Sequence, residues 1–94
     1  MATDDWPHPS WQAFRHLVIG RDYRVVQAFR DFDGQAHDVG EAWTFHGHSF
    51  LPYDDGLSLF VVQDGRQRQI RMRWADEDQG PIVDALHAYI QPLT

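Results

Sequence analysis

The sequence lacks two residue types altogether, Cys and Lys, and it is poor in positive charge. Its eight basic residues are all Arg and stand against 14 acidic residues, which leaves a formal net charge of −6 over 94 residues. Without Cys there is no disulfide framework, no thiolate zinc site and no Cys nucleophile. A net negative charge opposes general affinity for nucleic acid and for anionic lipid. Nucleic acid is therefore an unfavoured partner.

Long apolar runs are also missing. No stretch approaches the roughly 20 apolar residues that cross a bilayer, and the acidic N-terminus leads into no apolar segment of the kind that a secretory signal has. We therefore expect a cytoplasmic protein that does not enter a membrane. A Gly-rich phosphate loop and a G-x-S-x-G nucleophile elbow are absent as well. Their absence favours a protein that is not an enzyme, and no cofactor is implied.

The composition is that of a folded domain. Hydrophobic residues make up 43% and aromatic residues 14% of the chain, which is enough for one core but, at this length, not for two. Residues 1–9 are polar and acidic and contain Pro7 and Pro9. We expect this segment to be a flexible tail and residues 10–94 to form a single domain.

Two helices are predicted, one near each end of the domain. Ser10 is a suitable cap for a short N-terminal helix, because apolar residues follow it at three-to-four spacing until Gly20. A C-terminal helix is expected to begin near Pro81, after a run of carboxylates that suits the positive end of a helix dipole, and to end before Pro92. Its apolar stripe consists of Ile82, Val83, Leu86, Tyr89 and Ile90.

Four strands are predicted between these helices, beginning near Tyr23, Glu41, Leu57 and Arg68. The Asp64-Gly65 step between the last two is a strong signal for a tight hairpin. The expected fold class is α+β: a small four-stranded antiparallel meander curled toward an SH3-like barrel, with a short N-terminal helix and a C-terminal helix that covers one open end or face. A flat four-stranded sheet with both helices on one face is the alternative.

A series of short motifs runs along the predicted domain. The motifs are Gly20-x-x-Tyr23-x-Val25, Phe29-x-Asp31-Phe32-Asp33, His37-x-x-Gly40-Glu41-x-Trp43-x-Phe45, the stretch from Pro52 to Val61 that reads P-Y-D-D-G-L-S-L-F-V, Ile70-Arg71 and Gln79-x-x-Ile82. This series resembles a family of small, mostly bacterial proteins catalogued as a domain of unknown function, DUF3601. The resemblance covers roughly residues 17–90 and implies one domain, but it implies no activity, cofactor or catalytic residue.

The motif His46-Gly47-His48 is the first candidate for chemistry. On a regular strand the two His side chains project to the same side and can reach one metal ion. With Asp54 or Asp55 they would form a site of two His and one carboxylate, of the kind that holds iron(II) or zinc. The alternative interpretation is two solvated His on the polar face of a strand, and a motif this short is weak without its third ligand.

Adjacent carboxylates at Asp54 and Asp55 are the second candidate. They could bind a cation, or act as acid and base if one were buried. In the alternative interpretation this segment is a turn, with Tyr53 packed on its rim. The turn is the better interpretation, because Asp side chains accept from nearby backbone N–H groups and Gly56 tolerates a positive φ.

The segment 66–73 is the third candidate, because it holds half of all the basic residues and no acidic one. Arg71 and Arg73 share one strand face, where they could meet phosphates or an acidic partner. The alternative is a solvated face on which Arg66, Arg68 and their neighbours pair with nearby carboxylates.

The sequence favours a non-enzymatic binding or accessory module that contacts a protein or peptide, and it leaves the oligomeric state open. Its binding surface is expected around the loop 31–40, Trp43, His46, His48 and Tyr53. One alternative is a small metal-binding or acid/base enzyme that uses the two His residues with Asp54 or Asp55. The other is a nucleic-acid contact through the segment 66–73.

Overall fold

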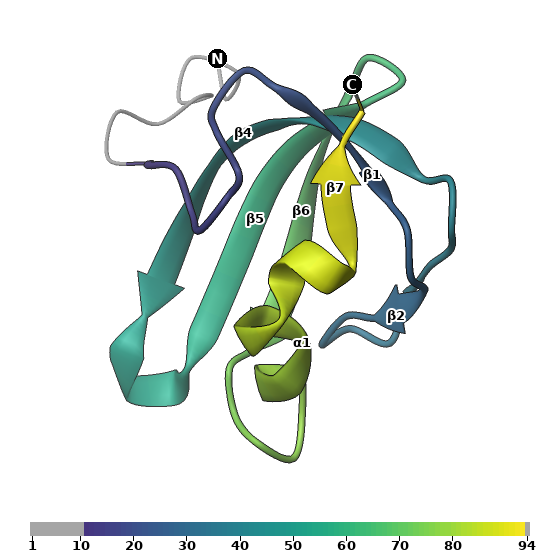
Figure 1. Cartoon of the computed structure of the whole chain (residues 1–94). Helices are drawn as coiled ribbons and strands as arrows, with labels where there is room; N and C mark the ends of the chain where they lie inside the picture. Colours follow the sequence, from purple (N-terminus) through teal and green to yellow (C-terminus); the bar gives the residue numbers. More distant parts are fainter. Residues whose placement is uncertain (1–10, 94) are drawn as a thin grey trace.

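The computed structural model describes residues 11–93 and is built mainly from β-strands (Figure 1). Its main sheet has five antiparallel strands in the order β6-β5-β4-β1-β7, and a separate two-stranded ribbon pairs β2 with β3. The strands are β1 (Asp22–Val25), β2 (Phe29–Arg30), β3 (Ala36–His37), β4 (Ala42–Leu51), β5 (Gly56–Gln63), β6 (Arg66–Arg73) and β7 (Ile90–Pro92), and the short helical elements are η2 (Pro52–Asp54), α1 (Gly80–Asp84) and η3 (Leu86–Ala88).

The predicted turn between β5 and β6 is confirmed. Asp64 and Gly65 have φ angles of 53° and 78°, and both lie in the left-handed region that a tight two-residue hairpin of this kind requires. Flanking residues pair in register from Gln63↔Arg66 to Gly56↔Arg73. The Asp64-Gly65 turn therefore sets the register between β5 and β6.

The expected N-terminal helix is wrong. Residues 11–20 instead form turns and isolated bridges, in which Phe14 and Leu17 exchange backbone hydrogen bonds of 2.8 and 3.1 Å. Arg15, between them, has a φ of 52°, which is incompatible with a right-handed helix. Such a short helix is not stable by itself, so contacts with the sheet decide this segment: Trp11 stacks on Phe60 with ring centroids 3.7 Å apart, and Leu17 is fully buried.

The expected C-terminal helix is also wrong beyond its first turn. Helix α1 ends at Asp84, and Ala85 leaves the helical region with φ −115° and ψ 36°. The chain then forms strand β7, which pairs with β1 through Val25↔Ile90 and Tyr23↔Pro92. Pairing covers the backbone groups of β1 that would otherwise be unpaired, and Pro92 is tolerated because β7 is an edge strand.

The predicted fold class must therefore be corrected to a mostly β architecture. The four predicted strand segments do lie side by side in chain order, but β7 joins them as a fifth strand. Within residues 11–93, β6 and β7 are the two sheet edges and do not pair with each other, so the sheet is open and does not form an SH3-like barrel. The flat sheet covered by two helices is not observed either.

The core lies between the curved sheet and the segment of α1 and η3 that crosses it (Figure 1). No helix in this described part of the chain is long and apolar enough to span a membrane. The predicted tail of residues 1–9 and the cap Ser10 lie outside the described residues. Buried hydrophobic residues of the core are Leu17, Tyr23, Val25, Phe29, Trp43, Phe45, Leu57, Leu59, Val61, Ile70, Met72, Val83, Leu86 and Ile90.

Candidate functional site

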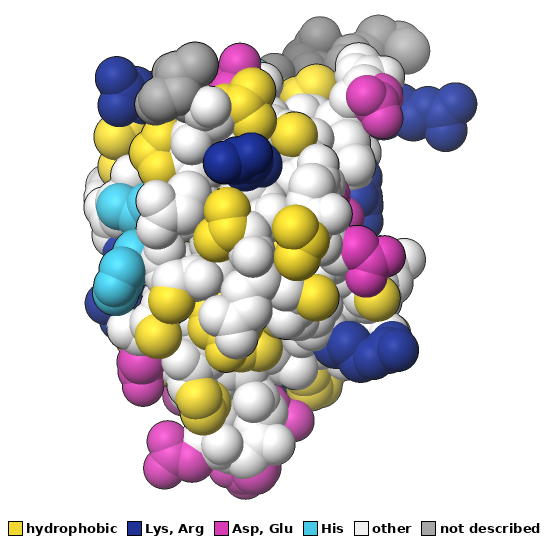
Figure 2. All heavy atoms as spheres, turned by 45° about the vertical axis from the view of Figure 1, so that its right-hand side comes forward, with side chains coloured by type: hydrophobic (Ala, Val, Ile, Leu, Met, Phe, Trp, Pro, Cys, Tyr) yellow, Lys and Arg dark blue, Asp and Glu magenta, His cyan; other side chains and the backbone are white. Residues whose placement is uncertain are grey.

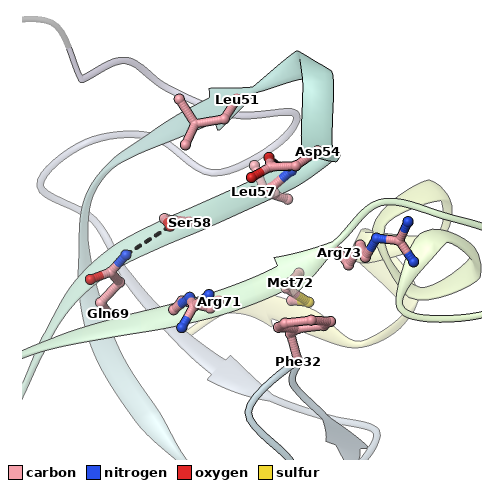
Figure 3. Close-up of a pocket in the computed structure, with 10 residues that line it drawn as sticks. Phe32, Leu51, Asp54, Leu57, Ser58, Gln69, Arg71, Met72 and Arg73 are labelled. Atoms are coloured by element: carbon pink, nitrogen blue, oxygen red, sulfur yellow. Dashed lines mark hydrogen bonds between the residues drawn. The ribbon is translucent and has the colours of Figure 1, made fainter.

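A hollow of about 300 Å³ lies over the β5–β6 hairpin, between the β4–β5 connection and the turn that follows β2 (Figure 3). Leu51 and Asp54 flank it on the side of the β4–β5 connection, and Phe32 stands at the opposite side. Strand β5 contributes Ser58, which lies opposite Arg71 of β6. Two of the side chains at the rim, Phe32 and Leu51, are large, apolar and about half exposed, at 47% and 54%.

The turn carrying Phe32 is tethered to the edge of β6. The backbone N–H of Phe32 donates to the Arg71 carbonyl at 2.7 Å, and the Arg71 guanidinium lies 5.8 Å from the centre of the Phe32 ring. The same guanidinium is 3.2 Å from Asp33, in an ion pair whose two side chains are about half exposed. Exposed pairs of this kind contribute little to stability, so the Arg71 charge can be shared with a ligand.

Arg73 also lines the hollow and forms an ion pair. Its guanidinium donates to the Asp78 carboxylate at 2.8 Å, and this hydrogen bond raises the pKa of Arg73. Arg68 projects from β6 toward Glu41, with 3.8 Å between guanidinium and carboxylate. Three of the four Arg residues in segment 66–73 therefore have a carboxylate near them, so the basic segment is largely neutralised.

The Asp54-Asp55 pair forms a turn. The Asp54 carboxylate accepts from the Gly56 backbone N–H at 3.0 Å, and Asp55 takes a left-handed conformation with φ 56°. The backbone carbonyl of Asp55 accepts a hydrogen bond from the Trp74 N–H at 2.8 Å. This bond connects the turn to the residue that follows β6. Tyr53, beside them, is 91% exposed.

A β-bulge lies at His46, the first residue of the predicted pair. Phe45 pairs with Val61, but the next paired residue is Gly47, opposite Phe60. The extra residue shifts the alternation of strand faces. The premise that His46 and His48 sit on a regular strand is therefore not met.

His48 is held against the N-terminal segment. Its backbone N–H and its ring Nδ1–H both donate to the Gln12 carbonyl, at 3.1 and 2.9 Å. Its ring also contacts Phe14, with centroids 4.7 Å apart. In the part of the chain that the structure describes, no group of three or more His, Asp or Glu side chains is arranged to hold a metal ion.

A cluster of buried charged groups, absent from the sequence predictions, lies under the turn that carries Phe32. His37 is fully buried, and each of its ring nitrogens contacts a carboxylate: Nε2 lies 2.8 Å from Asp31 and Nδ1 lies 2.6 Å from Glu41. The Asp31 carboxylate also accepts from the Gln35 backbone N–H at 3.0 Å. We call Asp31, His37 and Glu41 the buried triad.

The protein surroundings of the buried triad are aromatic. Phe29 stacks on the His37 ring with centroids 4.8 Å apart, and the indole N–H of Trp43 donates to Glu41 at 3.1 Å. Trp43 itself is 3% exposed and belongs to the core, so it does not line the hollow. Phe29, Trp43 and the three triad residues all lie in the motifs by which the chain resembles DUF3601. Their place in these motifs is the one signal in the sequence that could have pointed to the cluster.

The triad shifts the pKa values of its members in opposite directions. Burial by itself would lower the pKa of His37, but hydrogen bonds and charge attraction from Glu41 and Asp31 outweigh it and raise the pKa above its ordinary 6.5. Burial would raise the pKa of Glu41, but the hydrogen bond and charge of His37, the Trp43 N–H and Arg68 lower it below its ordinary value. The charged forms of both groups are therefore favoured.

Comparison with known proteins agrees with the resemblance seen in the sequence. A solved structure of an integron cassette protein from the mobile metagenome of Vibrio cholerae is similar, with a TM-score of 0.86 and 36% identity over 88% of this chain and 93% of that one. No curated protein matches this chain. The family described as domain of unknown function DUF3601 matches residues 8–93, nearly the entire length. The chain therefore belongs to the DUF3601 family.

Proposed function

We propose that this protein is a non-enzymatic binding module that holds a segment of a protein or peptide partner in the hollow over the β5–β6 hairpin. The observation that carries the proposal is the hollow itself, in which the half-exposed side chains of Phe32 and Leu51 stand on either side of Arg71. A volume of about 300 Å³ accommodates one or two side chains of a partner. Aromatic and Arg side chains are the types most enriched at binding surfaces.

The exposed aromatic side chain of Tyr53 extends this surface. Tyr53 follows Leu51 by two residues and is 91% exposed at the tip of the β4–β5 connection. On the face drawn in Figure 2, hydrophobic side chains form small groups among polar and charged ones. The surface around the hollow thus offers an apolar anchor, an aromatic rim and a guanidinium within one short region.

The two alternative functions have less support. The acid/base enzyme was predicted on His46, His48 and Asp54 or Asp55, and such an enzyme needs titratable groups that meet at one substrate. The Nδ1–H of His48 instead donates to the Gln12 carbonyl, and the Asp54 carboxylate accepts from the Gly56 N–H within its own turn. Nucleic-acid binding needs several unneutralised cations in a row along the phosphate backbone. Arg68 and Arg73 each have a carboxylate nearby, and the weak, exposed pair of Arg71 leaves a single charge between them. The bulge at His46 likewise removes the regular spacing on which the metal site was predicted.

A peptide selection with matched Arg variants tests the proposal. Peptides selected from a random library on the wild-type chain are expected to bind Arg71→Gln at least about tenfold more weakly, which corresponds to about 1.4 kcal/mol. Binding to Arg66→Gln is expected to change by less than about twofold, because Arg66 lies on the same strand but does not line the hollow. Isothermal titration calorimetry measures both affinities.

Nuclear magnetic resonance then locates the bound peptide. Shifts of the Phe32, Leu51 and Arg71 signals on titration are expected. Peptides that bind Arg71→Gln and Arg66→Gln equally, or that shift only signals remote from the hollow, would contradict the proposal, as would a selection that enriches no peptide at all.

A further inference from the structure

The hydrogen bonds of the buried triad require two protons on one imidazole ring. An ionised carboxylate can only accept a hydrogen bond, and a neutral imidazole donates through only one nitrogen. Both ring nitrogens of His37 lie within 2.8 Å of a carboxylate oxygen. While both carboxyl groups are ionised, only the imidazolium form of His37 satisfies Asp31 and Glu41 together. Loss of one ring proton would set a nitrogen lone pair directly against a buried carboxylate.

The charges around the ring lead to the same requirement. Asp31 reaches His37 from the turn after β2, Glu41 from the start of β4, and Arg68 from β6 lies 3.8 Å from Glu41. Two carboxylates, one imidazolium and one guanidinium sum to zero. With neutral His37 the cluster would hold an unbalanced negative charge in a buried place, which is costly.

The triad is mechanically linked to the hollow through a short piece of chain. Asp31 immediately precedes Phe32, and His37 ends the β2–β3 ribbon on the far side of the same turn. Asp31 also organises the turn itself, because its backbone N–H donates to Gln35 and its side chain accepts from Gln35. The other tethers of the turn, the Phe32–Arg71 hydrogen bond and the Asp33–Arg71 ion pair, lie at the surface.

We infer that the buried triad is a pH-sensitive latch: His37 in its doubly protonated form holds the 31–37 turn and its Phe32 side chain beside the hollow, and loss of one ring proton releases them. The latch itself stands on the contacts of the triad. Its consequence for a ligand rests on the proposed function, since Phe32 forms one side of the proposed binding site. Peptide affinity is then expected to fall as the latch opens.

The direction of the pH dependence follows from the raised pKa of His37. Its stabilising contribution is fully present below the ordinary value of 6.5 and is lost as the pH rises through the raised value in the folded protein. Glu41, whose pKa is lowered, contributes above its ordinary value of 4.5 and loses its contribution as the pH falls through the lowered one. The latch is therefore closed between the lowered pKa of Glu41 and the raised pKa of His37, and it opens as the pH rises through the latter.

The variant Asp31→Asn tests the latch without removing its shape. The side-chain oxygen of the introduced amide still accepts from Gln35, and its NH₂ group can donate to Nε2 of a neutral His37 while Nδ1–H donates to Glu41. In this variant all hydrogen bonds of the 31–37 turn can form with a singly protonated His37. The amide protection of the turn should therefore no longer fall as the pH rises. Asp33→Asn is the matched control, because it removes a carboxylate of the same turn that pairs with Arg71 instead of His37.

Two measurements on the full chain decide the inference. Nitrogen chemical shifts of His37 are expected to show both ring nitrogens protonated at about pH 6 in the wild type. Between about pH 6 and about pH 9, amide protection at Phe32 and Gln35, corrected for intrinsic exchange, is expected to fall about tenfold or more in the wild type and in Asp33→Asn. In Asp31→Asn it should change by less than about twofold.

The inference is overturned if His37 carries a single ring proton at about pH 6, or if Asp31→Asn shows the same loss of protection as the wild type. A peptide arm separates this result from that of the proposed function. If amide protection of the turn falls with rising pH but peptide affinity stays constant, the latch does not control binding in the hollow. Failure of every peptide to bind would contradict the proposed function, and the exchange data would still decide the latch.

Discussion

Replacement of His37 by Ala is expected to lower the free energy of unfolding by about 3–5 kcal/mol at neutral pH. The substitution leaves Asp31, whose side chain is 2% exposed, without its imidazolium partner, and it leaves Glu41, 13% exposed, with the more distant Arg68 at 3.8 Å. Removing one partner of a buried pair is far more costly than losing an exposed pair, because the remaining charge is desolvated and unpaired. It also removes the ring on which Phe29 stacks.

Chemical denaturation of the wild type and His37→Ala measures this loss. Small domains are stable by only about 5–15 kcal/mol, so the variant will unfold at much lower denaturant concentrations or be unfolded without it. His87→Ala is the matched control, because His87 is exposed, and it is expected to change stability by less than about 0.5 kcal/mol. A loss below about 1 kcal/mol in His37→Ala would show that the triad carries no buried charge pair.

Gly47→Ala is expected to destabilise the protein by about 2–4 kcal/mol, through both strain and steric overlap. Gly47 has a φ of 140°, a conformation that residues with a Cβ rarely adopt. A Cβ at this position would overlap the Cβ of Trp11, whose ring stacks on Phe60. The N-terminal segment must therefore shift away from the sheet, and its contacts with His48 are lost with it.

Gly40→Ala separates the two causes. Gly40 also has a positive φ, 98°, but a Cβ there meets nothing within 4 Å. This control should therefore cost only the backbone strain of about 1 kcal/mol. Equal losses of unfolding free energy in the two variants, measured by denaturant titration, would mean that Trp11 does not pack closely on the bulge.

The four longest strands, β1, β4, β5 and β6, were predictable because their signals are local, whereas the short strands β2, β3 and β7 were not predicted. Alternating burial along β6 and the Asp-Gly turn before it define the β5–β6 hairpin without reference to the rest of the chain. The helices were not predictable, because three-to-four spacing of apolar residues over one or two turns does not distinguish a helix from a turn. The apolar pattern continues to Ile90, but there the chain forms backbone hydrogen bonds with the otherwise unpaired edge of β1 and becomes strand β7.

The candidate site was predicted in part. Arg71, Arg73 and Asp54 line the hollow, and Tyr53 is exposed in the adjoining β4–β5 connection without lining it. Phe32 and Leu51 were not singled out, because their role depends on the approach of two separate connections over the β5–β6 hairpin. Trp43 was expected at the binding surface, but the structure places it in the core beside Glu41.

By itself, the sequence determined which chemistry is absent and where the chain turns. Missing Cys residues and the Asp-Gly hairpin are properties of residues or near neighbours. Only the tertiary structure decided that Asp31, His37 and Glu41 form one buried cluster and that the excess charge of the basic segment is met by carboxylates from elsewhere in the chain. The physical reason is that burial and pairing of charges depend on which segments pack together, and no local pattern specifies that packing.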